Sequence, residues 1–106
     1  MRPTTIYGLC ASDDQVIRYV GQTSFALPKR LGQHLRASRQ RGRARVRNWI
    51  ASVVARGAKV QMVELKRDAA WNIDEVDFIK RFRAGGFDLV NHADGGDGCR
   101  GFSRLK

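Results

Sequence analysis

The chain has 106 residues, of which 20 are Lys or Arg and 10 are Asp or Glu, so its formal net charge is +10. This length predicts one domain with one modest core, and an apolar content of 42% argues against disorder. The sequence contains no run of about 18 apolar residues that would span a membrane, and no signal-peptide core. Two cysteines do not make a disulfide framework, so we expect an intracellular protein.

Six segments have the patterns of secondary structure. Residues 4–10 and 16–22 are rich in β-branched and aromatic side chains and flank a turn-rich loop, which predicts a β-hairpin. Apolar residues repeat at helical spacing over 27–38 and over 45–56, with Gly57 as a stop. Apolar and polar residues alternate over 59–65, which predicts a third strand. The apolar spacing over 72–84 predicts a third helix, and a glycine-rich tail follows at about 92–106. The order predicts one α+β domain with a small sheet.

Two of these helices are expected to bury an apolar stripe. The stripe of the helix at 45–56 consists of Val46, Trp49, Ile50, Val53 and Val54. The stripe of the helix at 72–84 consists of Ile73, Val76, Phe78, Ile79 and Phe82.

The basic residues are concentrated in one part of the chain. The stretch between Asp14 and Glu64 has no acidic residue and eleven basic ones. Arginine forms forked hydrogen bonds with phosphate, and large apolar residues of the kind that a membrane-surface helix needs are missing between Arg36 and Arg45. The pattern favours nucleic acid over a membrane, although a solvated face is the alternative. The densest group comprises Arg36, Arg39, Arg41, Arg43, Arg45 and Arg47.

Glu75 interrupts the apolar stripe of the third predicted helix. At about 100° per residue it lies about 20° from Phe82 and about 40° from Ile79, while Asp74 and Asp77 fall on the opposite face. A carboxylate facing a core needs a cation or several donors. Glu75 is therefore either a metal ligand or a partner in a structural ion pair.

Two further pairs of residues are candidates for a site. Arg30 and His34 lie four residues apart and share a helix face, which suits phosphate binding and proton transfer or an ordinary core boundary. Tyr7 and Tyr19 project on one face of the hairpin if the register is even, and a register centred near Asp13 would place them directly opposite each other. Strand tyrosines are usually packing residues, but a tyrosine near a cation can also hold or deprotonate water.

In this order, these residues resemble the motifs of the GIY-YIG endonuclease superfamily. Its two strand motifs look like Thr5-Ile6-Tyr7 and Tyr19-Val20-Gly21. The family's helical arginine is matched by Arg30, with His34 one turn later, its glutamate by Glu75 and its asparagine by Asn91. The match covers about residues 4–98. Thr5 stands where the family has glycine, and Val20 stands where it has isoleucine.

The resemblance implies a fold and a reaction. The fold would be a small three-stranded antiparallel sheet flanked by helices, and the reaction would be hydrolysis of DNA phosphodiester bonds with one divalent metal, Mg²⁺ or Mn²⁺. Glu75 would bind the metal, which acts as a Lewis acid on the scissile phosphate. Tyr7 would be the general base or would position water, and Tyr19 would orient the water or the phosphate.

The resemblance assigns roles to three more residues. Arg30 would stabilise charge on the phosphate, His34 would assist, and Asn91 would brace the site or contact phosphate. All six residues, from Tyr7 to Asn91, should then converge at one edge of the sheet.

Two other functions account for the same charge. A non-catalytic basic protein that binds nucleic acid would need the arginines but not an acid on an apolar helix face. A nuclease module that depends on a separate DNA-recognition domain or partner would bind and cut poorly by itself.

Overall fold

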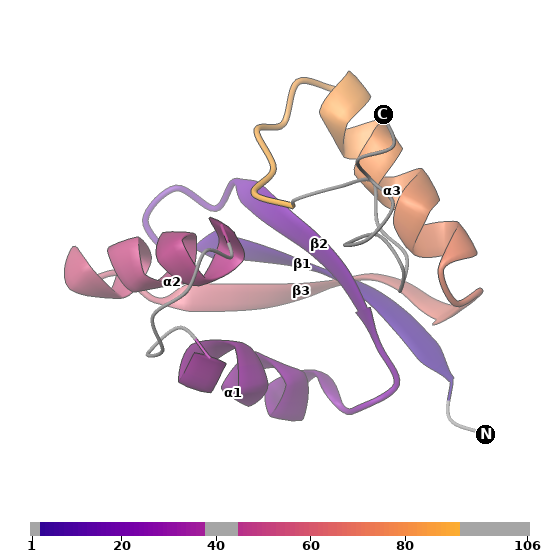
Figure 1. Ribbon diagram of the computed structural model, residues 1–106, viewed down its shortest axis with the longest axis horizontal. Coiled ribbons are helices and arrows are strands. Elements are labelled where there is room, and N and C mark those ends of the chain that lie inside the picture. Colours follow the sequence, from indigo (N-terminus) through magenta and orange to yellow (C-terminus); the bar gives the residue numbers. More distant parts are fainter. Residues whose placement is uncertain (1–2, 38–44, 92–106) are drawn as a thin grey trace.

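The computed structural model describes residues 3–37 and 45–91. It contains β1 (Thr4–Ala11), β2 (Ile17–Thr23), α1 (Leu27–Ala37), α2 (Arg45–Ala55), β3 (Val60–Ala69) and α3 (Ile73–Ala84). The strands form one antiparallel sheet in the order β2-β1-β3, so β1 is central (Figure 1). The predicted α+β fold, a small three-stranded antiparallel sheet with helices beside it, is confirmed.

Both faces of the central strand are buried, and each face has its own core. Tyr7, Leu9 and Ala11 point to the face that α1 and α2 cover, where α2 contributes Trp49 and Ile50. Because side chains alternate along a strand, the other face receives residues such as Ile6 of β1 and Val20 of β2. There they pack against α3, which lies across the sheet from α1 (Figure 1). A site that joins α1 to α3 must therefore form at an edge of the sheet.

Two residues that were predicted to lie in a buried apolar stripe are exposed, so these two predictions are wrong. Val54 is exposed, because the buried face of α2 is limited to Trp49, Ile50 and Val53. Ile73 is 71% exposed, because it is the first residue of α3 and precedes the part of the helix that packs on the sheet.

The helix stop predicted at Gly57 is confirmed. This glycine has a φ of 85°, and its N–H donates to the Val54 carbonyl at 3.0 Å.

The third strand is longer than the predicted 59–65, since it continues to Ala69. It remains paired with β1 as far as Thr4↔Ala69, through register shifts on either side of Ile6. The extension includes Lys66, Arg67 and Asp68, all exposed at the sheet edge, so an apolar pattern could not reveal it. The tail predicted at 92–106 lies outside the described residues. Within residues 3–37 and 45–91, no helix has the length and apolar character needed to cross a membrane.

Candidate active site

The two tyrosines lie on the same face of the hairpin but not directly opposite each other. Tyr7 pairs with Gly21, and Tyr19 pairs with Leu9, so the rings are diagonal neighbours with centroids 6.3 Å apart. The register centred near Asp13 is therefore wrong. The β1–β2 pairing also has an irregularity between Leu9 and Cys10, beyond which Cys10 pairs with Ile17. The diagonal arrangement still brings both rings to the face covered by α1.

Gly21 makes room for the Tyr7 ring. A Cβ at this position would lie 2.5 Å from Tyr7 Oη, 2.6 Å from Tyr7 Cζ and 2.9 Å from Tyr19 Cε2. These distances are shorter than any ordinary carbon contact, and Tyr7 is fully buried, so the ring has little freedom to retreat. The glycine is thus required by the close approach of Tyr7, its direct partner on β1, and of Tyr19, two residues away on β2. The sequence motif contained this residue, but only the register explains it.

A hydrogen-bonded chain links Arg30, Tyr7 and His34. Arg30 Nε donates to Tyr7 Oη at 3.2 Å, and Tyr7 Oη lies 2.7 Å from His34 Nε2. A guanidinium can only donate, so the single phenolic proton is left to point at His34. We therefore assign the neutral His34 tautomer that carries its proton on Nδ1. The spacing of Arg30 and His34 on α1 lets one helix hold both ends of the chain.

Burial sets the protonation states in this chain. Desolvation, with a smaller effect of the Arg30 guanidinium, lowers the pKa of His34 to about 4. Desolvation raises the pKa of Tyr7, and the charge of Arg30 together with hydrogen bonds from Arg30 and Tyr19 partly opposes this rise. At neutral pH the chain therefore consists of a cationic arginine, a neutral phenol and a neutral imidazole whose unprotonated Nε2 accepts the Tyr7 hydrogen bond.

Glu75 approaches this chain from α3. It and Ile79 are the buried residues of that helix, with Glu75 only 8% exposed, as its place in the apolar stripe predicted. On the other face, Asp74 forms an ion pair with Lys66 at 3.1 Å, and Asp77 with Arg81 at 2.9 Å. The Glu75 carboxylate acts electrostatically on Tyr7, whose pKa it raises.

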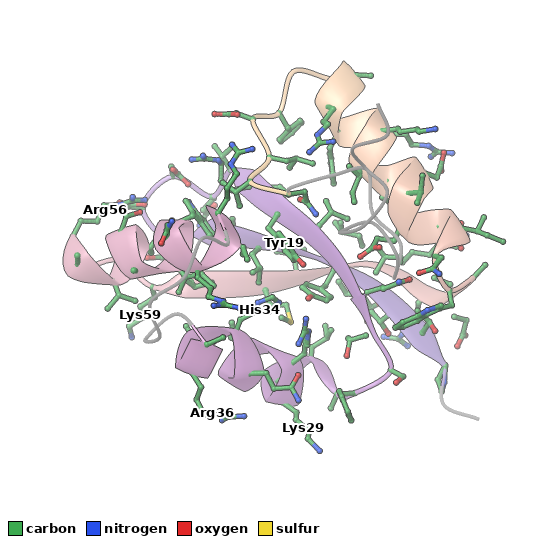
Figure 2. All side chains as sticks on the ribbon, in the orientation of Figure 1. Tyr19, Lys29, His34, Arg36, Arg56 and Lys59 are labelled. Carbon is green, nitrogen blue, oxygen red and sulfur yellow. The ribbon has the colours of Figure 1, made fainter. Side chains whose placement is uncertain are left out.

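Glu75, Tyr19 and Arg30 line one pocket of about 300 Å³, which also includes Gln22, Thr23, Ser24, Phe25 and Trp71. Its lining comes from the end of β2, the loop to α1, α1 itself, Trp71 and α3. Tyr7 and His34 are not part of this lining. Both are buried, and the His34 ring meets the Tyr19 ring edge to face with centroids 5.4 Å apart. Figure 2 labels Tyr19 and His34.

The donor set of the pocket fits one type of metal site. In the ranges that the structure covers, no three His, Cys, Asp or Glu side chains are grouped as metal ligands, which argues against a zinc-like site there. Mg²⁺ instead keeps several waters and needs one or two carboxylates together with substrate phosphates. A single buried carboxylate bordering an open pocket matches that requirement, so Glu75 is suited to Mg²⁺ or Mn²⁺.

Asn91 has a different position from the other five residues. Its side chain accepts from Val20 N at 3.0 Å and donates to Val20 O at 2.8 Å, so it pairs with the main chain of the edge strand β2. It does not line the pocket of Glu75 and Arg30. Tyr7, Tyr19, Arg30, His34 and Glu75 are thus brought together, whereas Asn91 supports the strand that carries Tyr19.

A pair of amide side chains positions α3 beside the pocket. Gln22 Nε2 donates to Asn72 Oδ1 at 2.6 Å, and Asn72 N donates to Gln22 Oε1 at 2.7 Å. Asn72 has a φ of 67° and immediately precedes α3, so this pair holds the first turn of the helix, which carries Glu75. Sequence reasoning missed both residues, because an amide pair 50 residues apart leaves no periodic signal.

The predicted DNA-binding arginines are only partly described. Arg36 and Arg45 are exposed and Arg47 is half-buried, while Arg39, Arg41 and Arg43 lie outside the described residues. Lys29 and Arg36 project from the side of α1 that faces away from the sheet (Figure 2).

Two other basic residues of the acid-free stretch have structural partners. Arg18 Nε donates to the Asp88 carbonyl at 2.7 Å, and Arg56 pairs with Asp13 at 2.8 Å. Not all of the excess charge is therefore available to a partner molecule.

Comparisons with protein-family models, curated proteins and solved structures found no match. The resemblance to the GIY-YIG motifs stays a prediction from the sequence.

Proposed function

We propose that this protein is a divalent-metal-dependent DNA endonuclease with a GIY-YIG-like site. The observation that carries the proposal is the common pocket of Tyr19, Arg30 and Glu75, with Tyr7 and His34 hydrogen-bonded behind it. A buried carboxylate, a guanidinium and a proton-accepting group together meet the needs of phosphodiester hydrolysis. An intracellular location follows from the choice of DNA as the substrate.

The tyrosines and His34 provide a route for the proton of the attacking water. Tyr19 borders the pocket and its hydroxyl hydrogen-bonds to Tyr7, whose own proton points at His34 Nε2. As the water oxygen attacks phosphorus, its proton passes to Tyr19, the Tyr19 proton to Tyr7, and the Tyr7 proton to His34. Each phenol ends neutral and His34 becomes the imidazolium, so neither tyrosine has to ionise ahead of the reaction.

Arg30 and Glu75 act on the phosphate. Arg30 borders the pocket while its Nε is bonded to Tyr7, so the same side chain can stabilise the developing negative charge and fix the proton route. Glu75 would hold Mg²⁺ or Mn²⁺, which when bound polarises the phosphate and stabilises the leaving oxygen. Asn91 braces the edge of β2 and contributes by keeping Tyr19 in place.

The arginines from Arg36 to Arg47 would contact the DNA backbone beside the site. Such contacts position the substrate without reading its sequence, and they make the affinity fall with increasing salt. The three of these arginines that are described lie on α1 and α2.

The test is nicking of supercoiled plasmid by the purified protein. We expect relaxed and linear products with Mg²⁺ or Mn²⁺ and none with chelator. Glu75→Gln should abolish nicking, whereas Asp77→Asn, which alters a carboxylate paired with Arg81 at 2.9 Å on the same helix, should not. Equal nicking by wild type and Glu75→Gln would contradict the role of Glu75.

The basic surface favours one other function, a non-catalytic protein that binds nucleic acid. Salt-sensitive binding of plasmid without cleavage under any metal condition would support that alternative. If fusion to a DNA-recognition domain then restored cleavage, the chain would instead be a nuclease module that needs a partner.

A further inference from the structure

Two partly exposed aromatic side chains line the candidate active-site pocket. Phe25 is 38% exposed and Trp71 is 44% exposed, and both border the pocket that contains Arg30 and Glu75. Large aromatic residues gain most when their surface is buried, so their exposure at a pocket points to a ligand that covers them.

The segments that carry the two aromatic residues are anchored by hydrogen bonds. Phe25 N donates to Thr23 Oγ1 at 3.0 Å, and Lys29 Nζ lies 4.6 Å from the centroid of the Phe25 ring. Trp71 immediately precedes Asn72, whose backbone and side chain are both bonded to Gln22. The rings therefore flank the pocket from two fixed segments, the loop after β2 and the turn before α3.

The remaining lining has the chemistry of a nucleotide site. Arg30 provides positive charge for phosphate, while Gln22, Thr23 and Ser24 offer donors and acceptors. A pocket of about 300 Å³ is at the lower end of the range for small-ligand sites. A base on the aromatic rings would then lie next to a phosphate at Arg30, with Glu75 beside it as the proposed metal ligand.

We propose that Phe25 and Trp71 form a stacking site for an unpaired DNA base beside the scissile phosphate. This inference rests on the proposed nuclease function and narrows its substrate to DNA with a single-stranded segment. The bases of an intact duplex are stacked on each other, so they can present a face to Trp71 only after they unpair. Aromatic rings with adjacent positive charge are the usual means of binding single strands without regard to sequence.

Tryptophan fluorescence offers a direct test, because the chain has two tryptophans and Trp49 is only 7% exposed. The full chain is titrated, with chelator present, with an oligothymidylate of about 12 nucleotides and with a blunt duplex of similar length. We expect the single strand to quench Trp71 and the duplex to quench it much less.

Variants separate stacking from general attraction to phosphate. Trp71→Ala should weaken binding of the oligothymidylate by roughly 5- to 150-fold, and Trp71→Phe should keep most of the affinity while removing the quenching. Ile73→Ala is the matched control, because Ile73 is an exposed apolar residue two positions away that does not line the pocket. Unchanged thermal melting of Trp71→Ala would show that the fold is intact.

The results distinguish this inference from the nuclease proposal. Quenching and the Trp71→Ala loss without any metal-dependent cleavage would support the stacking site and overturn the nuclease. Cleavage of DNA with no effect of Trp71→Ala on single-strand affinity would overturn the stacking site and leave the nuclease standing. Equal weakening of single-strand and duplex binding by Trp71→Ala would also overturn the stacking site.

Discussion

Replacing Gly21 by alanine should disable the candidate site by displacing the Tyr7 ring. The added Cβ would lie 2.5 Å from Tyr7 Oη and 2.6 Å from Cζ, and Tyr7 is fully buried. Overpacking of this kind costs about 1–3 kcal/mol. Loss of the Tyr7 hydrogen bonds to Arg30 and His34 adds about 1–3 kcal/mol. The lower entropy of the unfolded alanine chain offsets about 0.4–1 kcal/mol, so we expect a net loss of about 1–6 kcal/mol.

Gly8→Ala is the matched control on the neighbouring strand. Gly8 pairs with Val20, and its added Cβ would meet Ile17 Cδ1 at 2.8 Å, the end of a flexible side chain rather than a tyrosine ring. We expect this variant to lose less than about 1.5 kcal/mol and to retain cleavage.

The assay is urea denaturation of both variants together with plasmid nicking. Gly21→Ala should be clearly the less stable of the two. It should nick plasmid no faster than Tyr7→Phe, a variant that lacks the hydroxyl bonded to Arg30 and His34. If the Gly21 and Gly8 variants were equally stable and equally active, the packing argument for Gly21 would be refuted.

Three further outcomes follow from the hydrogen bonds and the protonation of the site. His34 takes up a proton near pH 6.5 in the unfolded chain but only near pH 4 in the folded chain. The free energy of unfolding should therefore fall by about 3 kcal/mol as the pH drops from 6.5 to 4. Urea denaturation of His34→Gln should not show this pH-dependent loss. Asn91→Ala should cost about 1–3 kcal/mol and speed amide exchange at Val20, whereas unchanged exchange would contradict its role at the strand edge. Gln22→Ala should lower the cleavage rate at saturating DNA by about 10- to 100-fold with little change in KM, because Asn72 no longer fixes the start of α3. A lower melting temperature with an unchanged cleavage rate would indicate a merely structural role.

The sequence predicted the fold because its signals are local. Alternating and helical apolar patterns located all six elements, and a charge inside an apolar stripe identified Glu75 as a buried carboxylate. The errors lie where local patterns end. Ile73 begins its helix and remains exposed, and the polar half of β3 is a strand only because β1 pairs with it.

The site was less predictable because its geometry depends on long-range contacts. The register of Tyr7 against Tyr19, and the irregularity between Leu9 and Cys10 in the same pairing, are encoded by no motif. The pairing of Gln22 with Asn72 depends on how the chain returns to β2 after 50 residues. Motif residues therefore indicated which side chains to examine, and the tertiary structure determined which of them line the pocket.

The most direct test of the central claim is to measure DNA affinity and single-turnover cleavage on the same substrate for wild type and Glu75→Gln. Cleavage by Glu75→Gln should fall by at least about 100-fold, because a metal ion at a scissile phosphate supplies several kcal/mol of stabilisation. Affinity measured with chelator should change by less than about threefold, because the basic residues bind the backbone independently of Glu75. Cleavage by Glu75→Gln at the wild-type rate, or no cleavage by either protein, would contradict the account.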